Sequence, residues 1–149
     1  MCRFNFTSGV MIGLLCVFYS GFATAGPPLV KVEIPDSIPG TTLVDAEGVV
    51  KLATTKSKLV IIDARIEGDR KHGFIEGSVS LPDINTNCAS LAKVIPRKNS
   101  PTLIYCNGVN CGRSVISSRI ALKCGYTNLY WFRGGFEEWS SMNYPVVSK

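Results

Sequence analysis

Residues 102–114 read Thr-Leu-Ile-Tyr-Cys106-Asn-Gly-Val-Asn-Cys111-Gly-Arg113-Ser114, and this stretch decides the fold. A short apolar run rich in β-forming residues ends at a cysteine, and a glycine-bearing segment follows. Apolar residues at helical spacing continue to position 123. A buried strand that leads through such a loop into a helix points backbone N–H groups at one spot. The predicted anion-binding loop consists of Asn107, Gly108, Val109, Asn110, Cys111 and Gly112.

Cys106 is the candidate nucleophile, because it ends the strand, and strand ends are held more rigidly than the middle of a loop. The helix dipole and the loop amides would stabilise its thiolate. Arg113 is the second candidate catalytic residue, since a cation at a helix N-terminus indicates an anion to be held there. Cys111 has three open interpretations: the nucleophile itself, a resolving thiol that closes a disulfide with Cys106, or a plain loop residue.

The remaining pattern alternates strands with helices. Residues 58–63 read as a strand buried on both faces, and shorter strands are expected at 79–81 and 128–132. Helices are expected at 67–73, 89–95, 113–123 and 136–141, with Asp45 capping an earlier helix and Gly125 ending the helix at 113–123. This order predicts an α/β fold with a mostly parallel central sheet of about five strands and helices on both faces.

Asp63 and Arg65 follow the buried strand and therefore lie at the carboxyl edge of the sheet. We interpret them as a structural pair that supports this edge rather than as catalytic residues.

Composition excludes several classes of protein. The 149 residues are 46% hydrophobic and 18% charged, which is typical of one globular domain. The net charge of +5 comes from scattered Lys and Arg residues, so no nucleic-acid partner is predicted. No metal site is predicted either, because the chain has no Cys-x-x-Cys pair and its single histidine, His72, is far from the cysteines.

The first residues predict export. Arg3 precedes an apolar run, and Ala23-Thr24-Ala25 supplies the small residues of a cleavage site. Residues 1–25 are therefore expected to be a signal peptide, residues 26–40 a proline-rich lead-in, and residues 41–149 the domain. The mature protein would be periplasmic or otherwise exported, without stable membrane association. The alternative is a domain anchored by an uncleaved N-terminal segment.

Four of the six cysteines would remain after cleavage. In an oxidising compartment four cysteines suggest disulfides, yet a mature chain of this size with a good apolar complement does not need one. Cys124 lies on the apolar stripe of its helix and is expected in the core. Cys88 lies in a loop and is either free or paired.

Four stretches together resemble a single rhodanese-like domain over residues 43–147. They are the strand that ends Asp63-Ala-Arg65, the segment 73–82, the cysteine loop, and the closing segment 125–139. Phe74 stands where the family has a histidine, in a segment that is structural. The family loop is usually shorter than the present one, in which six residues separate Cys106 from Arg113.

The resemblance implies a sulfurtransferase without metal or organic cofactor. A Cys106 persulfide would take a sulfane sulfur from a thiosulfate-like donor and pass it to a thiol or cyanide. The expected partners are a small anionic sulfur donor and a thiol acceptor or sulfur-accepting protein. Two alternatives stay open: a periplasmic thiol–disulfide relay through Cys106 and Cys111, and a non-enzymatic sulfur-carrier or binding module.

Overall fold

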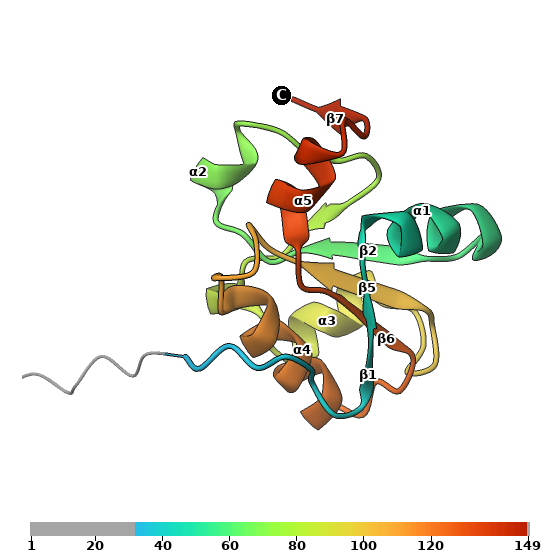
Figure 1. The fold of residues 1–149 in the computed structure, drawn as a ribbon. Helices are drawn as coiled ribbons and strands as arrows, with labels where there is room; N and C mark the ends of the chain where they lie inside the picture. Colours follow the sequence, from blue (N-terminus) through green and yellow to red (C-terminus); the bar gives the residue numbers. More distant parts are fainter. Residues whose placement is uncertain (1–31, 149) are drawn as a thin grey trace, which may run out of the picture. The chain divides into compact units, whose positions relative to one another are not determined.

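Five parallel strands form the central sheet of the computed structural model, which describes residues 32–148 (Figure 1). Their order across the sheet is β1-β6-β5-β2-β4. The strands are β1 (Thr41–Val44), β2 (Val60–Asp63), β4 (Val79–Ser80), β5 (Thr102–Tyr105) and β6 (Leu129–Phe132). A separate antiparallel pair joins β3 (Phe74–Ile75) to β7 (Val146–Val147). The α/β fold with a mostly parallel five-stranded sheet is therefore confirmed.

Helices cover both faces of this sheet, as the alternation of strands and helices predicted. α1 (Ala46–Thr55) and α5 (Gly135–Ser141) pack on one face, against Ile61 and Leu103. α3 (Cys88–Val94) and α4 (Arg113–Lys123) pack on the other face, against Ile62 and Ile104. Successive residues of a strand thus pack into the hydrophobic cores on opposite sides of the sheet, because their side chains point to opposite faces.

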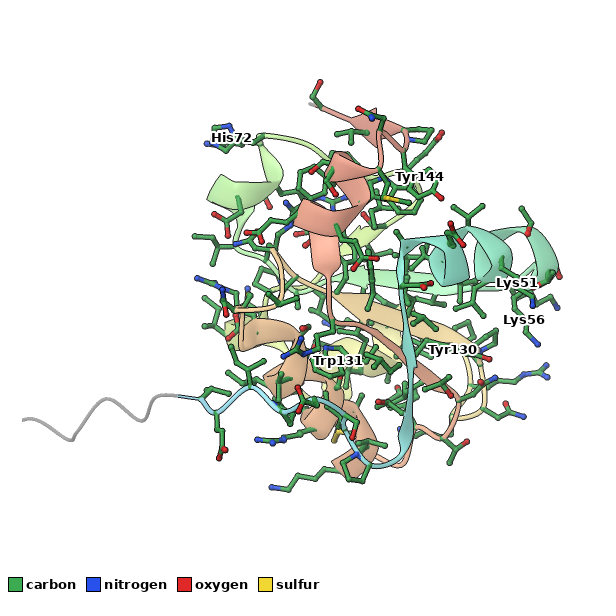
Figure 2. The ribbon with its side chains drawn as sticks, in the orientation of Figure 1. Lys51, Lys56, His72, Tyr130, Trp131 and Tyr144 are labelled. Atoms are coloured by element: carbon green, nitrogen blue, oxygen red, sulfur yellow. A yellow bond between two sulfur atoms is a disulfide. The ribbon has the colours of Figure 1, made fainter. Side chains whose placement is uncertain are left out.

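Two short helical segments complete the fold, α2 (Glu67–Arg70) and the 3₁₀ turn η1 (Asp83–Asn85). His72 follows α2 and is exposed, with its ring directed outward (Figure 2). Asp45 caps α1 as predicted, and its side chain accepts a hydrogen bond of 2.8 Å from the N–H of Gly48. Across residues 32–148, no helix has the length and apolar character needed to cross a membrane.

Cys124 is not a simple core residue, because it forms a disulfide with Cys88. Cys88 is the first residue of α3, and Cys124 ends α4 on the same face of the sheet. Packing of these two helices brings the two Cα atoms to 5.4 Å, within the range that a disulfide needs. The sequence left the pairing of Cys88 open, and a separation of 36 residues gave no local signal for this pair.

The described part of the lead-in, residues 32–40, packs against the domain. Ile38 is buried in a small cluster with Val115 of α4 and Trp131 of β6, and Val32 and Ile34 lie at its edge. Arg133 holds the same segment by donating a hydrogen bond of 3.2 Å to the carbonyl of Pro35. The segment adds an apolar strip to the domain rather than serving only as a linker. The predicted signal peptide, residues 1–25, lies outside the described residues.

Candidate functional site

The cysteine loop leaves the carboxyl end of β5 and ends at the first turn of α4 (Figure 1). β5 is buried over its whole length and lies between β6 and β2, so the start of the loop is fixed by neighbours on both sides. Within the loop, the N–H of Cys111 donates a hydrogen bond of 3.0 Å to the carbonyl of Gly108. No side chain caps the start of α4. The first N–H groups of α4 are therefore available to donate hydrogen bonds to the loop or to an anion bound in it.

A pocket of about 400 Å³ lies beside this loop. Five of the six predicted loop residues line it, together with the predicted Arg113. The lining residues are Asn107, Gly108, Asn110, Cys111, Gly112, Arg113 and Glu137. Val109 is 43% exposed and belongs to a different surface hollow. Cys106, the predicted nucleophile, does not line the pocket.

Cys106 lies beneath the loop and is only 1% exposed. Its thiol donates a hydrogen bond of 3.2 Å to the carbonyl of Cys111, and its Sγ is 3.1 Å from the hydroxyl of Ser114. The Ser114 oxygen in turn accepts a hydrogen bond of 3.0 Å from the indole N–H of Trp131. The adjacent Cys111 and burial both raise the pKa of Cys106. Cys106 is therefore a buried, protonated thiol in this conformation.

Cys111 has the opposite character. It is half-buried and stands on the pocket wall. The hydrogen bond from Cys106 lowers the pKa of Cys111 to about 6, with further help from the N–H groups of Arg113 and Asn107 and from the Arg113 charge. Cys111 is therefore mostly thiolate at neutral pH, and it is the loop thiol that faces the pocket.

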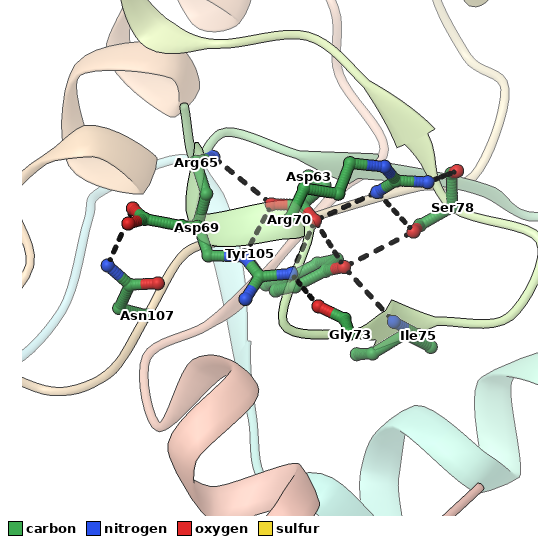
Figure 3. A network of polar contacts seen from close by, with 9 residues as sticks. All are labelled: Asp63, Arg65, Asp69, Arg70, Gly73, Ile75, Ser78, Tyr105 and Asn107. Carbon is green, nitrogen blue, oxygen red and sulfur yellow. Dashed lines mark hydrogen bonds and ion pairs between the residues drawn. The ribbon is translucent and has the colours of Figure 1, made fainter. Parts of the chain in front are cut away.

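Acidic side chains surround the loop, and the sequence analysis did not identify them. Asp83 Oδ1 lies 3.5 Å from Nη1 of Arg113, and this buried oxygen makes no hydrogen bond within the described structure. Asp69 accepts a hydrogen bond of 3.0 Å from the Asn107 side chain (Figure 3). Asp83 begins η1 directly after β4, at the same sheet edge as the loop, and this position was the available signal.

Glu137 of α5 also lines the pocket. The first turn of α5 is held against the loop, because the N–H of Glu137 donates a hydrogen bond of 2.7 Å to the carbonyl of Asn107. A side chain at Gly108 would meet the Glu137 carboxylate, so the carboxylate would have to move if this glycine were replaced. Among residues 32–148, the pocket lining thus contains one cation, Arg113, which is paired with Asp83, and one carboxylate, Glu137, without an ion pair.

Asp63 and Arg65 meet at the end of β2 in a buried polar network (Figure 3). Asp63 accepts hydrogen bonds from Arg65 at 2.8 and 2.9 Å, from Arg70 at 2.8 Å and from the Tyr105 hydroxyl at 2.8 Å. Burial raises the pKa of Asp63, but the hydrogen bonds and charge of Arg65 outweigh it and hold that pKa below its ordinary value. The network links β2, α2 and β5 through side-chain hydrogen bonds, and the interpretation of Asp63 and Arg65 as a supporting pair stays a prediction.

Comparison with known proteins agrees with this architecture. The family model described as "Rhodanese-like domain" matches residues 46–142, which include every strand of the central sheet except β1.

The chain belongs to the rhodanese-like domain family.

Its relatives include a protein of Buchnera aphidicola subsp. Baizongia pistaciae (strain Bp), described only as uncharacterized. The two are 33% identical over 91 residues, which are 60% of each chain. Among solved structures, a thiosulfate sulfurtransferase from Pseudomonas aeruginosa superposes with a TM-score of 0.63 at 25% identity. That match covers 72% of this rhodanese-like chain but only 20% of the Pseudomonas chain.

A Bacillus halodurans protein superposes with a TM-score of 0.64 at 18% identity, over 72% of this chain and 77% of its own. That likeness shows the fold alone. The family model and both structural matches agree on the rhodanese-like fold.

Proposed function

We propose that this rhodanese-like protein is a sulfurtransferase that takes a sulfane sulfur from a thiosulfate-like donor and carries it as a persulfide on its cysteine loop. The observation that carries the proposal is a thiol with a pKa of about 6 on the wall of a pocket formed by that loop and the uncapped start of α4. A thiolate is the form that attacks sulfur, so the loop is ready for this chemistry at neutral pH.

The donor step is a displacement at sulfur. The thiolate attacks the outer sulfur of thiosulfate, the bond between the two donor sulfurs breaks, and sulfite leaves with the bonding pair. The product is a persulfide anion, which the loop N–H groups and Arg113 stabilise as they stabilise the Cys111 thiolate. A thiol or cyanide then removes the outer sulfur. The step uses no metal or organic cofactor.

The sequence assigns the nucleophile to Cys106, and this assignment stays a prediction. Cys106 and Cys111 are in contact, since the Cys106 thiol lies 3.2 Å from the Cys111 carbonyl. The proposal therefore assigns the persulfide to this pair of thiols.

We place the reaction in an oxidising compartment outside the cytoplasm. The N-terminal sequence supports this location, and so does the Cys88–Cys124 disulfide, because structural disulfides persist in such compartments. The partners in this proposal are a small anionic sulfur donor and a thiol or sulfur-accepting protein.

A thiol–disulfide relay is the second candidate, and the contact between the Cys106 thiol and the backbone of Cys111 favours it. A reduced Cys106–Cys111 pair would reduce a disulfide in a partner without handling sulfane sulfur.

Sulfite release tests the proposal. The reduced protein is mixed anaerobically with thiosulfate, and sulfite is measured per chain, with a Cys106→Ser/Cys111→Ser double variant as the matched control. We expect about one sulfite per chain from the wild type and none from the control. Continued sulfite formation on addition of cyanide indicates turnover, whereas a single equivalent without turnover indicates a carrier. If the wild type forms no sulfite but reduces a disulfide-containing peptide, the sulfurtransferase proposal is wrong and the relay is correct.

A further inference from the structure

The two loop thiols occupy different depths. Cys111 lies on the wall of the pocket, while Cys106 is buried beneath it. A donor that enters the pocket therefore meets Cys111, and the loop covers Cys106. The polar groups that contact the Cys106 thiol are the Cys111 carbonyl and the Ser114 hydroxyl.

This layering determines what each thiol can attack. A sulfur delivered to Cys111 extends into the pocket, toward the N–H groups that stabilise negative charge. The inner sulfur of that persulfide, Cys111 Sγ, belongs to the residue whose carbonyl lies 3.2 Å from the Cys106 thiol. A buried thiol next to a persulfide is well placed for exchange at the inner sulfur, provided that the leaving group is stabilised.

We propose that Cys111 receives the sulfane sulfur and that Cys106 then resolves the Cys111 persulfide, so that the loop releases hydrosulfide and closes a Cys106–Cys111 disulfide. The inference rests on the proposed function and extends it, because it names sulfide as a product. It also reverses the order of the two thiols that the sequence predicts.

The second step is an exchange at the inner sulfur of the Cys111 persulfide. Cys106 Sγ forms a bond to Cys111 Sγ, and the bond from Cys111 Sγ to the outer sulfur breaks. The outer sulfur leaves with the bonding pair and takes the Cys106 proton, which gives hydrosulfide. The sulfane sulfur is reduced by two electrons, and the two thiols are oxidised to a disulfide. A further turnover requires a dithiol reductant to reopen that disulfide.

Two neighbours suit Cys106 to this step. Because the Ser114 oxygen already accepts a hydrogen bond from Trp131, its own hydrogen is free to point at Cys106 Sγ and stabilise negative charge there. The Arg113 charge and the adjacent N–H groups act at the pocket side, where the hydrosulfide departs.

The test is a single turnover with thiosulfate, in the absence of reductant and oxygen, followed by sulfide and sulfite measurement and by intact mass. For the wild type we expect about one sulfite and one sulfide per chain, and a mass lower by two hydrogen atoms. Cys106→Ser should release sulfite but no sulfide, and should gain the mass of one sulfur atom. Serine is chosen because its hydroxyl can keep the hydrogen bond that Cys106 makes beneath the loop.

Cys111→Ser provides the independent measurement, since residue 111 is half-buried in a loop and serine is close to cysteine in size. We expect this variant to release neither sulfite nor sulfide. Sulfite release by Cys111→Ser with a persulfide on Cys106 would overturn the inference. So would wild-type protein that keeps the added sulfur and forms no sulfide, although the proposed function would then stand. Absence of sulfite from all three proteins would refute the proposed function itself.

Discussion

Cys111 differs from an ordinary surface cysteine in the pKa of its thiol, and this property can be measured directly. Its pKa is lowered to about 6, so the thiolate dominates above that pH and is lost below it. The alkylation rate at Cys111 should therefore rise with pH to a plateau, with its midpoint near pH 6. Cys106 is buried and has a raised pKa, so it should stay unmodified over the same range.

Two variants of Cys106 show how much of the lowered pKa of Cys111 is due to the Cys106 hydrogen bond. Cys106→Ala removes the hydrogen-bond donor, so the midpoint should move up toward the ordinary value of about 8.5. Cys106→Ser keeps a donor, and its midpoint should stay close to that of the wild type. An unchanged midpoint in the alanine variant would mean that the loop amides and Arg113 alone lower this pKa.

Arg113 is expected to hold the anionic donor, although Asp83 shares its charge. Arg113→Ala removes a charge-assisted contact worth about 1.5–3 kcal/mol, so the KM for thiosulfate should rise about tenfold or more. The rate of sulfur loss to an uncharged thiol acceptor should change less. An unaltered KM would show that the loop amides hold the donor without the guanidinium.

Glu137 should act against dianionic donors, because its carboxylate faces the pocket without an ion pair among residues 32–148. Glu137→Gln removes this repulsion while keeping a similar shape, so kcat/KM for thiosulfate should rise severalfold. Glu76→Gln serves as the control, since Glu76 is an exposed carboxylate in the turn between β3 and β4. An equal gain in both variants would point to net charge rather than to the pocket.

At the scale of elements, the Cys88–Cys124 disulfide fastens α3 to the end of α4, the helix whose start forms the site. Closing a loop of this size is worth about 3–4 kcal/mol, so Cys88→Ser/Cys124→Ser should lower the free energy of unfolding by about that amount. Urea unfolding measures this loss. Sulfite release from the folded variant should be unchanged, and a variant that folds but releases none would mean that the disulfide positions the loop as well.

The elements also show how far sequence patterns reach. α4 begins at Arg113 and ends at Lys123 as expected, because the apolar spacing and the glycine at position 125 are local signals. In the structure this glycine has the positive φ that ends a helix. The pairing of Cys124 with Cys88 depends on how two helices pack, which no local spacing encodes. Asp83 and Glu137 were not predicted for the same reason, because they come to the loop from η1 and α5 through tertiary packing.

For the whole molecule, the order of strands and helices was enough to predict the layered α/β architecture and the edge of the sheet that carries the site. The depth of each thiol was not predictable. Strand-end position favoured Cys106 as the nucleophile but carried no information on exposure, and in the structure its thiol is buried and donates a hydrogen bond to the carbonyl of Cys111. Loop conformation decides such exposure, and six residues between Cys106 and Arg113 allow many conformations.

The central claim is that the cysteine loop carries sulfane sulfur, and an isotope label on the outer sulfur of thiosulfate tests it most directly. The reduced protein is mixed with labelled thiosulfate, quenched at short times, and digested without reductant. The account predicts that the label appears first in the peptide containing Cys111 and later in sulfide. Label that never enters this peptide, or that collects on Cys88 or Cys124, would contradict the account.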